Sequence, residues 1–148
     1  MKKIAVLIFT IMLVLASTAQ NRVTLTQNGK TLKFAAKPNA QFENLNGMIN
    51  LSIIGNNTSV IELNNIEESQ FACGKRLKEE TIKITYIDSK NNRTYTSVGN
   101  VQVSISCTGI ARQYIVIFLG KIKNGRSTIN ISASLTVKSK PKEYVKTF

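Results

Sequence analysis

The sequence predicts an all-β protein, an antiparallel β-sandwich of about 7–9 strands. Apolar and polar residues alternate over short runs, most regularly in Thr81–Ile87 and Thr128–Val137, as they do in strands with one buried face. Turn residues such as Asn-Gly separate these runs, which is typical of hairpins. The connectivity stays open. An immunoglobulin-like order is one option, although the chain has no tryptophan and its two cysteines lie too close in sequence for the usual pair around a core tryptophan.

The first part of the chain predicts two hairpins. In Arg22–Ala36, alternating runs flank Asn28-Gly29, a dipeptide that suits a type I′ turn because both of its residues take a positive φ. The polar segment Gln41–Gly47 is expected to be a loop. The strands of the second hairpin flank a Gly-Asn-Asn turn and are Met48–Ile54 and Ser59–Leu63.

The segment Asn64–Glu80 shows the least regular pattern. Asn65 followed by Glu68 resembles a capping box, and Gly74 would end the short helix that this box would begin. The basic run that follows, Gly74–Lys78, fits a loop better than a helix.

The second half of the chain predicts five further strands, separated by turn residues. Asp88–Arg93 is a turn cluster, and Gly99-Asn100 is expected to reverse the chain again. Tyr114–Leu119 is apolar at every position, so its strand is expected to be central and buried on both faces. The expected strands are Thr81–Ile87, Thr94–Val98, Val101–Cys107, Gln113–Ile122 and Thr128–Val137.

The first nineteen residues have the three parts of a secretory signal peptide. Lys2-Lys3 gives a positive start, Ile4–Leu15 is apolar at nearly every position, and small residues precede a cleavage site after Ala19. This apolar run is shorter than the roughly 20 residues that a membrane-spanning helix needs, and no later run is long enough either. We therefore expect residues 1–19 to be removed, 20–137 to form one domain and 138–148 to form a basic tail, in a protein that is secreted or periplasmic.

Cys73 and Cys107 are the two cysteines of the chain. In an exported protein an even number of cysteines favours a disulfide. A bridge that closes a loop of this length would add roughly 3–4 kcal/mol to the free energy of unfolding. Cys107 shares the apolar face of its expected strand, so we expect the bridge to be buried.

The chain carries a formal net charge of +12. Such an excess attracts polyanions over long range, although lysines also serve to keep a sheet protein soluble. The candidate partners are an unknown protein or an envelope polyanion such as lipopolysaccharide or polysaccharide. Nucleic acid is disfavoured because no row of aromatic residues accompanies the basic ones. The candidate contact surface consists of three basic clusters: Lys75, Arg76 and Lys78; Lys121, Lys123 and Arg126; and Lys138, Lys140 and Lys142.

The sequence lacks the residues of most catalytic and metal sites. It contains no histidine, which removes His-activated nucleophiles, His general bases and His metal ligands together. Asp88 is the only aspartate, and the adjacent glutamates Glu67-Glu68 and Glu79-Glu80 would point to opposite sides of a strand. We therefore expect no enzyme activity, no cofactor and no metal.

Together these features favour an exported, non-catalytic binding protein of the cell envelope or extracellular space, such as an adhesin-like or assembly-accessory module. Its contact surface would be loops or an exposed sheet edge. Two alternatives from other classes stay open. One is a small outer-membrane β-barrel, in view of the strand number and of Phe148 at the end of the chain. The other is a loop-presenting enzyme inhibitor or polyanion binder.

Overall fold

The all-β prediction is confirmed by a computed structural model, which describes residues 21–140. The expected signal peptide and residues 141–148 of the expected tail lie outside the described residues. Ten strands and one short 3₁₀ turn, η1 (Glu68–Gln70), make up the described chain. The strands are β1 (Arg22–Gln27), β2 (Lys30–Leu32), β3 (Gln41–Leu45), β4 (Met48–Ile54), β5 (Val60–Glu67), β6 (Arg76–Glu79), β7 (Lys83–Asp88), β8 (Arg93–Cys107), β9 (Gln113–Asn124) and β10 (Ser127–Lys138).

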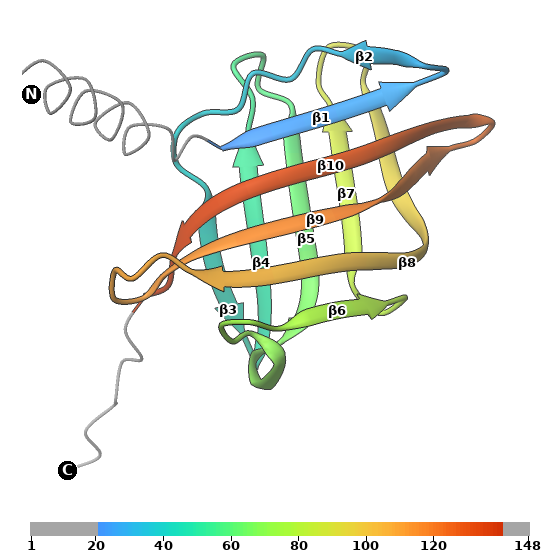
Figure 1. Ribbon diagram of the computed structural model, residues 1–148. Helices are drawn as coiled ribbons and strands as arrows, with labels where there is room; N and C mark the ends of the chain where they lie inside the picture. The colour runs from blue at the N-terminus through green and yellow to red at the C-terminus, as the bar shows by residue number, and fades with distance from the viewer. Residues whose placement is uncertain (1–20, 141–148) are drawn as a thin grey trace, which may run out of the picture.

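All ten strands belong to one antiparallel sheet, which curls so that its two halves pack face to face (Figure 1). The hydrogen-bonded order is β2-β1-β10-β9-β8-β7-β5-β4-β3, and β6 pairs with β8. We call β1, β6, β8, β9 and β10 the front layer, and β3, β4, β5 and β7, which cross behind them, the rear layer (Figure 1). Strands that are neighbours in the chain are mostly neighbours in the sheet. The connectivity is therefore largely a meander, whereas an immunoglobulin-like sandwich divides its strands between two separate sheets.

Two Asn-Gly turns shape the first half of the chain. Asn28 and Gly29 have φ angles of 50° and 74°, which confirms the expected tight turn between β1 and β2. Asn46 and Gly47 form a second such turn, with φ angles of 53° and 81°. The expectation of a loop over Gln41–Gly47 is therefore wrong, because this turn folds the segment back onto β4 as strand β3. Its polar composition fits a strand at the edge of the sheet.

The expected helix within Asn64–Glu80 is also wrong. β5 continues to Glu67 because Ile66 takes its place in the core, fully buried. Only the single turn η1 follows. The run Gly74–Lys78, expected to be a loop, becomes strand β6 from Arg76 onward because it pairs with Val101–Ser104 of β8.

Strand β8 passes continuously through the turn that was expected at Gly99-Asn100. Its pairing with β9 shifts between Val98 and Gln102, and Gly99 has a φ of 70°. The dipeptide therefore forms a bulge, which bends the strand without reversing it. Because of this length, β8 pairs with β7 over residues 93–96 and with β6 over residues 101–104.

The core fills the space between the two layers, and β9 shows how it is built. Val116, Phe118 and Ile122 of β9 are fully buried, whereas Ile117 and Leu119 are 41% and 38% exposed. The expectation that this strand is buried on both faces is therefore wrong. β9 is central, between β8 and β10, but no described segment covers its outer face. The largest fully buried side chains are Phe118, Leu25, Leu51, Ile53, Ile61, Leu63, Ile66, Ile82, Ile84, Ile105, Ile122 and Ile129.

An aromatic cluster closes one end of the core. The ring of Tyr86 stacks on that of Tyr95 at 5.7 Å and meets the edge of Phe34 at 6.2 Å. Burial raises the pKa of the Tyr86 hydroxyl, and the nearby charge of Asp88 raises it further. The folded protein therefore favours the neutral form of this side chain.

We predict that Phe118→Ala lowers the free energy of unfolding by about 3–5 kcal/mol, because it removes a large side chain from a closely packed core. The neighbouring change Leu119→Ala, on the outer face of the same strand, should cost under about 1 kcal/mol. Urea unfolding of the two variants measures both values. Equal losses would contradict the inward and outward assignment along β9.

The raised pKa of Tyr86 predicts a loss of stability at high pH. An unfolded tyrosine releases its proton near about pH 10, whereas folded Tyr86 holds it to higher pH. The contribution of Tyr86 to the free energy of unfolding is thus complete below the pKa of the unfolded state. It declines as the pH rises from there through the higher pKa of the folded state. The stability difference between the wild type and Tyr86→Phe should therefore shrink between about pH 8 and about pH 11 in urea unfolding. A constant difference would contradict the shift.

Candidate binding surface

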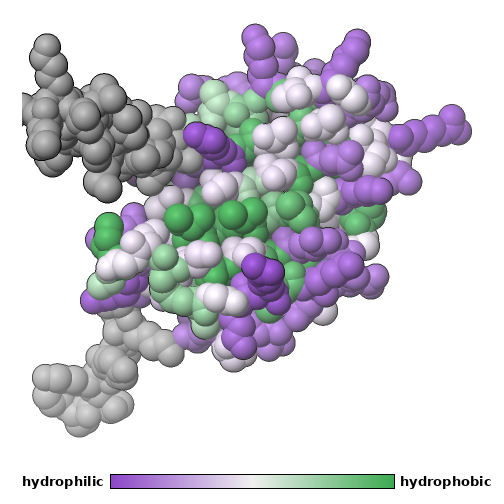
Figure 2. Space-filling view, in the orientation of Figure 1, coloured by the Kyte–Doolittle hydropathy of each residue, from purple (hydrophilic) through white to green (hydrophobic). Residues whose placement is uncertain are grey.

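The outer face of β9 carries an exposed apolar column. Ile115, Ile117 and Leu119 point outward because Val116 and Phe118, which alternate with them, face the core. Figure 2 shows an apolar patch at this place, over β9 and its neighbours, with hydrophilic side chains around much of it. The same alternation that builds the core therefore places aliphatic side chains in solvent.

The register flanks this column with polar side chains, which are small except for Gln102 of β8 beside Leu119. Ile117 lies between Ser104 of β8 and Ser134 of β10, and Leu119 lies beside Ser132 of β10. These hydroxyl side chains are too short to cover the aliphatic ones. The apolar column at the centre of the front layer therefore stays accessible.

Basic residues frame the column. β6 contributes Arg76 and Lys78, which lie two strands from β9 and therefore about 10 Å from it. On the opposite side β1 contributes Arg22, also two strands away. Lys121 and Lys123 continue along the outer face of β9 itself. We call the surface formed by these five basic residues and the three aliphatic residues of the column the basic–apolar face.

Acidic side chains avoid the basic–apolar face. In the five strands of the front layer the only acidic residue is Glu79. It pairs with buried Val101 and so points to the other side of β6 from the basic residues. Its carboxylate accepts hydrogen bonds from Gln70 at 2.9 Å and from Thr81 at 3.0 Å. The strands of the rear layer have the opposite balance, with Glu43, Glu62, Glu67 and Asp88 against Lys83.

A groove of about 460 Å³ opens on this face, where β6 lies against β8. It combines aliphatic side chains with positive charge and contains no acidic residue. The residues that line it are Arg76, Leu77, Lys78, Gln102, Val103, Ser104, Ile117 and Leu119.

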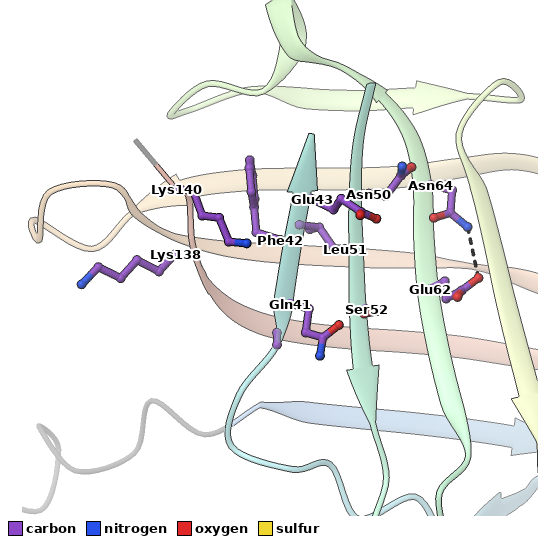
Figure 3. Close-up of a pocket in the computed structure, with 11 residues that line it drawn as sticks. Gln41, Phe42, Glu43, Asn50, Leu51, Ser52, Glu62, Asn64, Lys138 and Lys140 are labelled. Atoms are coloured by element: carbon purple, nitrogen blue, oxygen red, sulfur yellow. Dashed lines mark hydrogen bonds between the residues drawn. The ribbon is translucent and has the colours of Figure 1, made fainter. Parts of the chain in front are cut away.

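A second groove, of about 560 Å³, crosses the outer faces of β3, β4 and β5 (Figure 3). Its lining is polar, with carboxylates such as Glu43 and Glu62 beside amides such as Asn64. The Asn64 amide donates a hydrogen bond to the Glu62 carboxylate at 3.4 Å. Lys138 and Lys140 also line this groove at the end of β10. The Lys140 side chain points toward Phe42, and that of Lys138 points away from it (Figure 3). Because it mixes both signs of charge, the second groove presents no single chemistry to a ligand.

The structure brings together four of the nine basic residues that the sequence singled out. These four lie on the basic–apolar face: Arg76, Lys78, Lys121 and Lys123. The others are dispersed: Lys75 precedes β6, Arg126 lies in the turn between β9 and β10, Lys138 and Lys140 line the second groove, and Lys142 lies outside the described residues.

The apolar column and Arg22 are not among the residues that the sequence singled out. The sequence does indicate the column, because Tyr114–Leu119 contains two interleaved sets of apolar residues, one for each face of the strand. Only the packing of the layers determines that one set is covered and the other is not. Arg22 stands alone in the sequence and joins the basic residues of β9 only through the pairing of β1 with β10.

The predicted disulfide between Cys73 and Cys107 is present, with a Cα–Cα distance of 5.3 Å. Both residues are exposed, so the expectation of a buried bridge is wrong. Cys107 keeps the alternation of its strand but is the last residue of β8, where the core has already ended.

The disulfide helps to position β6. Gly74 N–H donates to the Ile105 carbonyl at 2.7 Å, and Ile105 N–H donates to the Lys75 carbonyl at 2.9 Å. Together with the bridge, these bonds hold the chain before β6 against the end of β8. Arg76 and Lys78 thereby obtain their place beside the apolar column.

Within residues 21–140, no group of three or more His, Cys, Asp or Glu side chains is placed to hold a metal ion. The same part of the chain contains no helix with the length and apolarity needed to cross a membrane. No family model, curated protein or solved structure matches the chain.

We predict that the double variant Cys73→Ser/Cys107→Ser loses roughly 3–4 kcal/mol of the free energy of unfolding and keeps a β-sheet circular-dichroism spectrum, because the core lies elsewhere. The bridge of the native protein should be reduced by dithiothreitol without denaturant, because both cysteines are exposed. Thiol titration of the folded protein tests this point. A bridge that opens only after unfolding would contradict the exposed position.

Proposed function

We propose that this protein is an exported, non-catalytic binding protein of the cell envelope or extracellular space, and that its basic–apolar face binds a polyanion there. The observation that carries the proposal is the segregation of charge. Within the strands of the front layer, five basic residues and no acidic residue point outward around β9, and exposed Glu80 directly follows β6. A surface whose positive charges only kept the protein soluble would have no need for this separation.

The spacing of the basic residues supports a joint electrostatic action. Residues two apart on a strand, such as Arg76 and Lys78 or Lys121 and Lys123, lie about 7 Å from each other. This is within the screening length of about 8 Å at physiological ionic strength. Within each of these pairs, the attraction for a multivalent anion therefore adds up.

The rigid setting of these residues also supports binding. All five stand on paired strands of one sheet, so little backbone entropy is lost when a partner docks. The signal-peptide pattern of residues 1–19 supports a partner outside the cytoplasm. Phosphate-bearing or carboxylate-bearing envelope polymers and lipids meet both requirements.

A second candidate function is strand addition at β3. One edge of β3 has no strand beside it in the sheet order, and Leu45 and Met48 at the tip of its hairpin are 53% and 40% exposed. An unpaired edge with apolar residues beside it accepts an extended peptide. This observation favours an assembly-accessory role for the rear layer, separate from the polyanion site.

Heparin affinity chromatography tests the polyanion site. The quadruple variant Arg76→Gln/Lys78→Gln/Lys121→Gln/Lys123→Gln should elute at a clearly lower salt concentration than the wild type, because it loses the adjacent charges of the face. The wild type should stay bound above roughly 0.15 M salt, where diffuse attraction is already screened.

The matched control removes the same number of charges elsewhere. Lys33, Lys37, Lys83 and Lys90 are exposed and lie outside the basic–apolar face, so their replacement by glutamine gives the same net charge. This control should elute close to the wild type. If both quadruple variants shift equally, only net charge matters and the proposed site is wrong.

A further inference from the structure

We infer that the polyanion is the surface of an anionic lipid bilayer, which the basic–apolar face contacts with its aliphatic column as well as its charges. This inference rests on the proposed function, to which it adds the chemical class of the partner. In this arrangement Ile115, Ile117 and Leu119 enter the interfacial region of the bilayer. The basic residues around them contact lipid phosphates.

The outer face of β9 differs from that of its neighbours. The outward residues of β10 that pair with the column are Ser132, Ser134 and Thr136, all polar. Ile117 and Leu119 stand between such residues with about two fifths of their surface exposed, 41% and 38%. A hydrophilic polymer has no apolar surface against which these side chains could be buried. A lipid interface removes them from water and meets the surrounding cations with phosphates at the same time.

The geometry of the basic–apolar face also fits a lipid surface. The face is one side of a sheet, so the column and the basic residues on either side of it, about 10 Å away, can touch one plane together. The groove on this face is lined by the aliphatic Ile117 and Leu119 together with the basic Arg76 and Lys78. A lipid with a phosphate headgroup carries apolar acyl chains close to a negative charge. It therefore complements both the aliphatic and the basic side chains of this groove.

The positive charge of the basic–apolar face complements the negative charge of lipid phosphates. Since Glu79 points away from the face and makes hydrogen bonds of its own, no strand residue of the face carries a negative charge that would repel a phosphate. A protein partner is less consistent with this surface. Protein interfaces concentrate their binding energy in tryptophan, tyrosine and arginine, whereas the apolar part of this face consists only of isoleucine and leucine and its two arginines stand on its outer strands.

Flotation with vesicles tests the inference on the purified protein at about 0.15 M salt. The wild type should bind vesicles of phosphatidylglycerol and phosphatidylcholine and leave pure phosphatidylcholine vesicles unbound. The double variant Ile117→Ser/Leu119→Ser should bind the anionic vesicles at least about tenfold more weakly. Its elution from heparin should not change, because its charges are intact.

The control variant is Ile87→Ser. Ile87 lies on β7 of the rear layer and is 37% exposed, so it matches the column residues in type and exposure. It should bind vesicles like the wild type. Melting temperatures of all variants verify that they are folded at the temperature of the assay.

The outcomes separate the inference from the proposed function. If the protein binds heparin but not anionic vesicles, or if the double variant binds vesicles as well as the wild type does, the lipid inference is wrong and the polyanion site stands. Equal binding to pure phosphatidylcholine vesicles would also overturn the inference. If neither heparin nor anionic vesicles retain the wild type, both proposals fail.

Discussion

The register that joins β9 to β8 and β10 is the constraint on which the core and the candidate surface both depend. It places Phe118 opposite Val103 and Ala133, all facing inward. A slip of one residue would turn every inward side chain of β9 outward. Gly120 helps to exclude such a slip. It faces the rear layer, and a Cβ there would lie 3.1 Å from the Cδ1 atom of Ile84, closer than packed carbon atoms normally approach.

The two faces of the front layer thus have different physical roles although they belong to the same strands. The inner face is closed by the rear layer. Buried Asn21, directly before β1, joins the loop between β2 and β3 to β10. Asn21 donates to the carbonyls of Lys37 and Pro38 and accepts a hydrogen bond from the Thr136 N–H. The outer face has no such cover among the described residues. Its aliphatic column and its basic frame are therefore free to meet a partner, and a lipid surface uses both.

The strands that the sequence predicted correctly are those in which local rules suffice. Met48–Ile54 was predicted with its observed bounds because alternation and the following turn agree. The errors arose where pairing decided the structure. Gln41–Leu45 is too polar to be recognised as a strand by itself, and becomes one because the turn at Asn46-Gly47 lays it against β4. Gly99-Asn100 has the composition of a turn, but both flanking segments pair with β9, so β8 stays continuous.

The candidate surface divides in the same way. The excess of basic residues, the pairing of Cys73 with Cys107 and the two apolar sets within β9 follow from the sequence alone, because composition and period-two alternation are local properties. Three features needed the tertiary structure: the side of β9 that stays open, the exposed position of the disulfide, and the meeting of Arg22, Arg76 and Lys121 on one face. Each of these depends on which strands become neighbours. Alternation determines which residues share a face, but only contacts between distant parts of the chain determine what lies against that face.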